Sequence, residues 1–128
     1  MSYYFSKKIR GTFESVIEKV TASLKSEGFG VLTEIDVKET LKKKLDVDFH
    51  KYRILGACNP SFAYKALQAE DKIGIMLPCN VIVQEKVEGE VEVAAIDPVA
   101  SMKAVDNPDL LNIAKQVQEK LKRVVESL

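Results

Sequence analysis

The dipeptide Glu88-Gly89 constrains the fold more than any other feature of this 128-residue chain. It separates two strand-like segments, residues 80–86 and residues 90–96, and in the second Val91 and Val93 alternate with glutamates. A short glycine-containing turn between two such segments is typical of a β-hairpin. Because a hairpin joins antiparallel neighbours, a doubly wound parallel sheet does not fit this sequence.

Strands and helices alternate through the rest of the chain. The predicted strands are residues 3–9, 29–35, 52–58, 73–86 (bent at Pro78) and 90–96, and the predicted helices are residues 13–27, 37–45, 60–69 and 109–127. A loose helical turn is expected at residues 100–105. The order β-α-β-(α)-β-(α)-β-β-α predicts an α+β fold, an antiparallel sheet of about five strands with helices packed mainly on one face. With no internal repeat and no linker-like segment, residues 1–128 form one expected domain.

The starts of the predicted helices carry recognisable caps. Thr12, Asp36, Asn59 and Asn107 stand at N-cap positions, and prolines follow the two asparagines. Three alanines in the helix at residues 60–69 would allow it to approach a sheet closely. The apolar stripe of the last helix suits either a lid on the protein's own core or a partner helix, and we favour the lid.

Charge and hydropathy exclude several classes of function. The chain has 19 basic and 19 acidic residues, so no overall field attracts nucleic acid or an anionic membrane. No secretion signal and no stretch long enough to span a bilayer are visible. Two cysteines in such a chain indicate reduced thiols, and we expect a cytoplasmic protein.

Both cysteines lie in a near-mirror arrangement within residues 52–83. Cys58-Asn59-Pro60 leaves the third strand, whereas Pro78-Cys79-Asn80 enters the fourth. If these strands are neighbours, both thiols lie at one end of the sheet, where they could form a reversible disulfide or hold a soft metal. Backbone N–H groups at the helix start would stabilise a thiolate at Cys58. The alternative is that each cysteine is a small buried core residue.

The two asparagines of this arrangement, Asn59 and Asn80, have two interpretations. Side-chain amides beside thiols can orient a ligand or stabilise an anion. Capping and turn formation explain both residues more simply.

The remaining candidate residues do not form a recognisable catalytic or metal site. His50 is the only histidine, and no paired spacing of zinc ligands occurs around it. The carboxylates Glu34, Asp36 and Asp97 lack a histidine, serine or second acid at a telling spacing. Tyr3, Tyr4 and Phe5 of the first strand are expected to be core or interface aromatics.

Several long motifs resemble a known family. They are Leu32–Val37, Ile54–Pro60, Ala66-Leu67, Leu77–Val81 and Asp97-Pro98. Together they are similar to the signature of the domain of unknown function 302 family, over nearly the whole chain. The resemblance implies a TATA-binding-protein-like layer of order β-α-β(4)-α, a small cytoplasmic prokaryotic protein and a homodimer. It transfers no catalytic role to any residue, and the neutral charge argues against DNA binding.

Three functions fit these observations. The favoured one is a binding or sensing module for a small molecule, a soft metal or a redox signal, using a rim of Cys58, Asn59, Pro60, Pro78, Cys79 and Asn80. The second is a thiol-dependent enzyme, with Cys58 as nucleophile and Cys79 as its resolving partner. The third is a structural homodimer module with inert core cysteines. No cofactor and no substrate can be named from the sequence.

Overall fold

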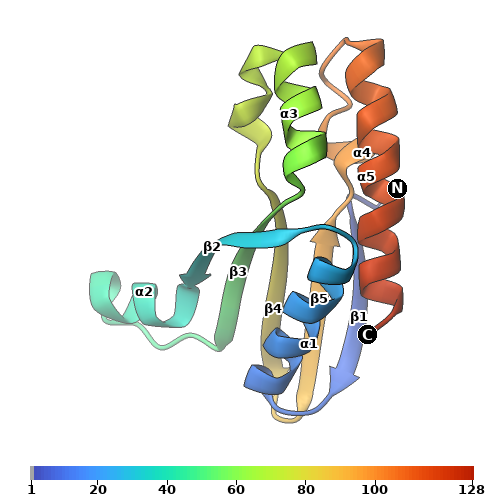
Figure 1. The fold of residues 1–128 in the computed structure, drawn as a ribbon. Helices are drawn as coiled ribbons and strands as arrows, with labels where there is room; N and C mark the ends of the chain where they lie inside the picture. The colour runs from blue at the N-terminus through green and yellow to red at the C-terminus, as the bar shows by residue number, and fades with distance from the viewer. Residues whose placement is uncertain (1) are drawn as a thin grey trace.

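The computed structural model describes residues 2–128 and consists of one sheet with its helices (Figure 1). The strands are β1 (Tyr4–Arg10), β2 (Gly30–Asp36), β3 (Lys51–Cys58), β4 (Cys79–Val87) and β5 (Glu90–Ile96). The helices are α1 (Phe13–Ser26), α2 (Val37–Leu45), α3 (Pro60–Ala69), the 3-10 helix η1 (Asp71–Met76), α4 (Pro98–Ser101) and α5 (Pro108–Glu126).

The five strands form an open, fully antiparallel sheet in the order β1-β5-β4-β3-β2. The predicted hairpin joins β4 to β5, and its Gly89 has a φ of 84°, which a glycine adopts at little cost. The first and second strands of the sequence therefore become the two edges. This arrangement confirms the predicted α+β fold class.

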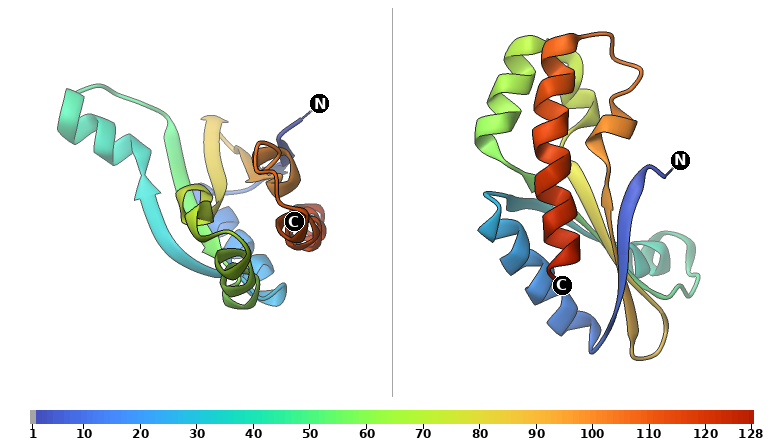
Figure 2. Two further views of the ribbon diagram at one scale, coloured as in Figure 1. Left: turned by 90° about the horizontal axis from the view of Figure 1, so that it is seen from above. Right: turned by 90° about the vertical axis from the view of Figure 1, so that its right-hand side faces the viewer.

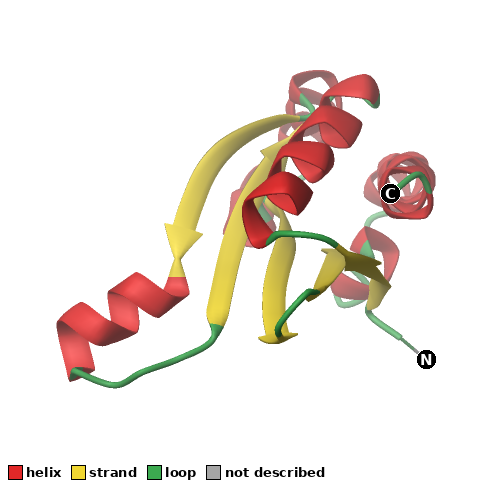
Figure 3. Cartoon of the chain, turned by 90° about the horizontal axis from the view of Figure 1, so that it is seen from below, coloured by secondary structure: helices red, strands yellow, loops and turns green. Residues whose placement is uncertain are grey.

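Helices α1 and α5 cover one face of the sheet, as Figure 2 shows from the side. Alternate residues of the central strands point toward these helices, and they form the main core with one stripe from each helix. Its fully buried members include Val16, Val20, Leu24, Leu55, Val81, Val83, Val91, Val93, Leu121 and Val124. The last helix is thus a lid on the protein's own core, as favoured from its stripe. Helix α2 contacts β2 and β3 and projects from the edge of the sheet, away from α1 and α5 (Figure 3).

Three of the four predicted N-cap residues cap their helices with a side-chain hydrogen bond. The side chains of Thr12, Asp36 and Asn107 accept hydrogen bonds from backbone N–H groups in the first turns of α1, α2 and α5. Asn59 occupies the N-cap position of α3 but makes no side-chain capping bond. Its amide nitrogen instead donates to the carbonyl oxygen of Glu27 at 3.4 Å, which links the start of α3 to the end of α1.

Two structural expectations were wrong. Residues 73–77 do not form a strand; Asp71–Met76 is the 3-10 helix η1, and β4 begins at Cys79. Helix α3 does not lie on the sheet but packs against α5 and η1, beyond the end of the strands (Figure 1). Both errors have one physical cause, because the segment between β3 and β4 forms a layer of its own over the upper part of α5.

A second, smaller cluster holds that layer in place. Ala66 of α3, Ile73 of η1 and Leu110 of α5 form its buried centre. Leu77, Met102, Val105 and Ile113 pack around it. None of the helices within residues 2–128 combines the length and hydrophobicity that crossing a membrane requires.

Candidate functional site

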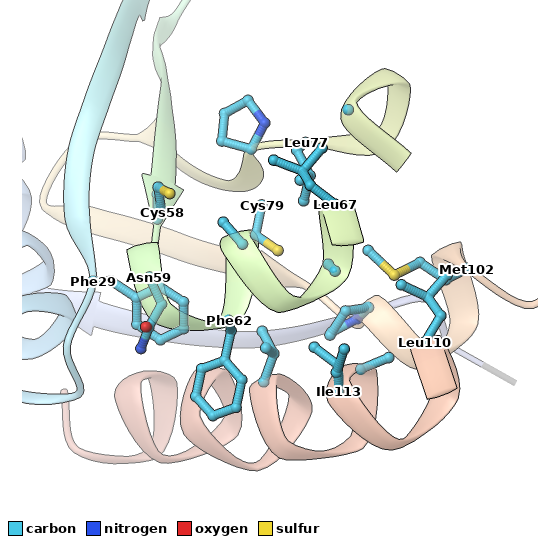
Figure 4. Close-up of a pocket in the computed structure, with 18 of the residues that line it drawn as sticks. Phe29, Cys58, Asn59, Phe62, Leu67, Leu77, Cys79, Met102, Leu110 and Ile113 are labelled. Atoms are coloured by element: carbon cyan, nitrogen blue, oxygen red, sulfur yellow. The ribbon is translucent and has the colours of Figure 1, made fainter. Parts of the chain in front are cut away.

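An apolar cavity of about 300 Å³ lies where the sheet ends and the α3–η1 layer begins. Its walls come from the ends of β3 and β4, from α3, and from the first half of α5 (Figure 4). Ligand pockets in proteins typically start at roughly this volume and are lined mostly by apolar side chains with few polar ones. Among the residues lining this cavity, Asn59 and the two thiols, Cys58 and Cys79, are the only polar or reactive side chains apart from the thioether of Met102.

The path of the chain between β3 and β4 creates the cavity. These strands are antiparallel neighbours, with Ala57 and Cys79 as Cα partners, so a tight hairpin could have joined them. The chain instead leaves the sheet after Cys58, builds α3 and η1, and returns through the cis peptide bond Leu77–Pro78. The small side chains Ala63 and Ala66 face the cavity from α3 and leave space that larger residues would fill.

Gly56 allows the return segment to lie close to the sheet. A Cβ atom at this position would lie 2.0 Å from Oγ1 of Thr33 and 2.8 Å from Cγ of Pro78. Neither distance is possible for a real side chain, so only glycine permits Pro78 to pack here. Sequence reasoning did not single out Gly56, although a glycine inside a central apolar strand is a signal of close approach.

Cys79 is a buried member of the cavity lining. It is 9% exposed, its thiol makes no hydrogen bond within the described residues, and its side chain lies among the other lining groups (Figure 4). Burial, and to a smaller extent the neighbouring Cys58, raises the pKa of Cys79 to about 11. Cys79 therefore remains a neutral thiol near pH 7, which is unsuitable for a nucleophile.

Cys58 differs from Cys79 in orientation and exposure. It follows Ala57, the partner of Cys79, so strand alternation directs Cys58 and Cys79 toward opposite faces of the sheet. Cys58 is half-buried, it lies at the side of the cavity, and both cysteines are free thiols. Side chains that leave neighbouring strands on opposite faces are poorly placed for a disulfide. The two thiols thus share a cavity without forming a pair.

The six residues proposed from the sequence separate into two groups. The structure brings together Cys58, Asn59, Pro78 and Cys79, which all line the cavity. It does not bring in the other two, Pro60 and Asn80, which are exposed and lie outside the lining. Pro60 is on the solvent side of the first turn of α3, and Asn80 points to the open face of the sheet because it alternates with Cys79 and Val81.

Sequence reasoning missed the largest part of the cavity wall. Phe29, Met102, Leu110, Ile113 and Ala114 line it from segments distant in sequence. Their apolar character indicated only that they are buried, and no local pattern indicated that they meet.

The other polar candidates have structural roles. Nε2 of His50 lies 2.8 Å from the side-chain oxygen of Gln84, whose amide donates to Glu92. Asp97 caps α4 and accepts hydrogen bonds from Gln118. No cluster of three or more histidine, cysteine, aspartate or glutamate residues that could hold a metal ion occurs in residues 2–128.

Arg53 completes this set of structural side chains. It forms ion pairs with Glu14, Glu34 and Asp36, and its guanidinium lies over the ring of Phe13.

Comparison with known proteins agrees with the resemblance seen in the motifs. The model of the family described as domain of unknown function DUF302 matches residues 5–128. The chain belongs to the DUF302 family. A crystal structure of an uncharacterised conserved DUF302 protein from Bacillus stearothermophilus is similar, with a TM-score of 0.90 and 28% sequence identity over 98% of each chain. Among curated proteins, no sequence matches significantly.

Membership of the DUF302 family fixes the fold of this chain and assigns no activity to it. The function of this DUF302 domain therefore has to be argued from the cavity and its thiols.

Proposed function

We propose that this DUF302 domain is a binding module for a small, largely apolar ligand held in the cavity between β3, β4, α3 and α5. The observation that carries the proposal is the lining itself, which is apolar except for Asn59, Cys58 and Cys79. A ligand would place its apolar body against Leu110 and Ile113 and its polar end near Asn59. Free thiols accord with a reducing compartment, and a cytoplasmic location remains part of this proposal.

The properties of Cys79 favour this function over the two other uses of the thiols. A soft metal held by both thiols would need the two sulfur atoms on one side of the site, whereas strand alternation directs Cys58 and Cys79 toward opposite faces of the sheet. Burial, which raises the pKa of Cys79 to about 11, makes this thiol a poor resolving partner for an enzyme with Cys58 as nucleophile. Binding of an apolar molecule, in contrast, needs only a neutral, buried Cys79.

A fluorescence titration with 1-aminoanthracene, a rigid apolar probe, tests the proposal. We expect saturable binding to the wild-type protein and at least about tenfold weaker binding to Ala63→Phe, whose ring would occupy the cavity. The matched control is Ala22→Phe, because Ala22 is exposed on α1 and does not line the cavity. Circular dichroism verifies that both variants fold. Equal binding by the two variants would place the probe elsewhere and contradict the proposal.

A second candidate function, a homodimer module, is favoured by helix α2. None of its residues is buried, and it projects beyond the edge of the sheet (Figure 2). Its apolar positions Val37, Leu41 and Leu45 lie every fourth residue, and Leu45 is 66% exposed. An exposed apolar stripe of this kind is typical of a surface that packs against another protein surface.

A second copy of this chain would match the charges around the stripe. Helix α2 carries Lys42, Lys43 and Lys44, and the hairpin and open face of β5 carry Glu88, Glu90 and Glu92. In a two-fold dimer each copy offers both surfaces. Light scattering would then show a dimer for the wild type and a monomer for Leu41→Glu. The exposed control on the same helix is Lys38→Gln, which changes the net charge by the same amount as Leu41→Glu. A wild-type monomer at high concentration would contradict this second function.

A further inference from the structure

The two thiols of the cavity differ enough to have different roles. Cys79 is buried in the wall, whereas Cys58 is half-buried at the side of the cavity. Leu32 of the neighbouring strand β2 also lines the cavity and is 68% exposed. An exposed apolar side chain near the half-buried Cys58 indicates where the cavity opens to solvent. A molecule that enters here passes Cys58 before it reaches Cys79.

The lining offers little other chemistry to a bound molecule. It contains no carboxylate, amine, imidazole or hydroxyl group, and the amide of Asn59 is engaged with Glu27. Sulfur is therefore the reactive element of this site, and sulfur reacts preferentially with soft electrophiles. An apolar enclosure selects apolar partners for that reaction.

We propose that Cys58 anchors ligands of the cavity covalently, and that the matching ligands are apolar molecules carrying an α,β-unsaturated carbonyl group. This inference rests on the proposed binding function and specifies its ligand class. Cys79 takes no part in the bond and forms the back wall of the cavity, as its neutral buried thiol allows.

The step adds the thiol across the carbon–carbon double bond. The Cys58 thiol gives its proton to solvent, and its sulfur forms a bond to the β-carbon. The π electrons of the double bond move onto the carbonyl group as an enolate, which then takes a proton from water at the α-carbon. The net reaction joins S–H to C=C, so no oxidant, reductant or leaving group is needed.

The start of α3 assists this addition. Cys58 stands two residues before Pro60, the first residue of this ten-residue helix. Because the side chain of Asn59 does not cap α3, no side chain within residues 2–128 accepts a hydrogen bond from the backbone N–H groups of Ser61 and Phe62. Such groups stabilise negative charge as it develops on the sulfur or on the carbonyl oxygen.

N-phenylmaleimide, an apolar unsaturated dicarbonyl, provides the test. We expect the labelling rate of Cys58 to saturate with reagent concentration, and to exceed by about tenfold at low concentration the rate for a free peptide covering residues 56–61. The saturated analogue N-phenylsuccinimide and the probe 1-aminoanthracene should both slow the reaction competitively. Iodoacetamide, small and polar, should label Cys58 with a rate that rises linearly. Peptide mass spectrometry identifies the labelled residue.

Three variants separate the contributions. Cys58→Ser and Cys58→Ala should form no rapid adduct, Cys79→Ala should keep the saturable reaction, and Ala63→Phe should lose saturation while iodoacetamide labelling continues. Circular dichroism confirms folding of each, and two substitutions at position 58 guard against one that fails to fold.

The outcomes distinguish this inference from the binding function on which it rests. Linear labelling at the rate of the peptide, or first labelling of Cys79, would overturn covalent anchoring. If 1-aminoanthracene still binds in the cavity, the proposed binding function survives that result. If 1-aminoanthracene does not bind either, both proposals fall.

Discussion

The two halves of α5 pack against different partners, and the difference explains why the molecule has a cavity. Its second half, with Val117, Leu121 and Val124, lies on the sheet and belongs to the main core. Its first half, with Leu110, extends beyond the strands and packs on α3 and η1. A sheet presents a continuous surface of alternating side chains, whereas two short helical segments meet α5 at few points.

The main core therefore has many buried members, and the α3–η1 layer has few. The small cluster has three buried members, Ala66, Ile73 and Leu110, and the cavity lies between it and the main core. Exposed apolar residues such as Ile75 and Tyr64 accompany this layer. The second half of α5 thus packs in the main core, and its first half lines the cavity.

The largest expected effect is on stability, and it is tested by the same substitution, leucine to alanine, in each half of α5. Leu121→Ala should lower the free energy of unfolding by about 4 kcal/mol, because Leu121 is fully buried under the sheet, where the surroundings cannot collapse. Leu110→Ala should cost less, about 2–3 kcal/mol, because the α3–η1 layer can move toward the space. Urea denaturation measures both.

Equal costs for the two substitutions would contradict the comparison. They would show that the α3–η1 layer is as rigid as the main core. Exposed Leu111 on the same helix provides the control, and Leu111→Ala should change the free energy of unfolding by less than about 0.5 kcal/mol.

The next prediction concerns the close contact of Gly56 in β3 with Pro78, at the point where the α3–η1 layer returns to the sheet. Gly56→Ala would place a methyl group against Thr33 and Pro78, and we expect a loss of about 1–3 kcal/mol with weaker 1-aminoanthracene binding, since Pro78 lines the cavity. Gly30→Ala, where no atom lies within 4 Å of the added carbon, is the neutral control. Thr33→Ala should restore part of the stability of Gly56→Ala. If it restored none, the cause of the loss would not be this contact.

The sequence predicted most of the fold because most of its signals are local. Thr12, Asp36 and Asn107 mark helix starts by hydrogen bonds to residues two or three positions away. The hairpin at Gly89 and the alternation of its strands are equally local. In contrast, residues 73–77 have the composition of a strand, but residues 73–76 belong to η1, with Ile73 buried against Ala66 and against Leu110 from a distant part of the chain.

The site was predictable only in part, for a similar reason. The sequence placed both thiols at one end of the sheet on the condition that the third and fourth strands are neighbours. The structure pairs these strands, with Ala57 opposite Cys79, and four of the six proposed residues line the cavity. The alternation of Cys79, Asn80 and Val81 could already have excluded Asn80, because Val81 belongs to the core. The contributions of Phe29 and Met102 depend on the three-dimensional packing, which no short pattern encodes.

The smallest expected effect tests the burial of Cys79 through the pH dependence of stability. Burial raises its pKa in the folded protein to about 11 from an ordinary value of 9.0. Above pH 9 the unfolded chain releases this proton and the folded protein keeps it, so the unfolded state binds fewer protons and stability falls as the pH rises. The stability that the neutral Cys79 thiol adds to the folded protein is complete below pH 9 and is lost between pH 9 and 11. The loss amounts to about 1 kcal/mol by pH 10. Cys79→Ala should therefore lose less stability than the wild type between pH 8 and pH 10. All other titrating groups are common to the two proteins. Parallel stability curves for the wild type and Cys79→Ala would mean that water reaches this thiol, and that the cavity opens to its back wall.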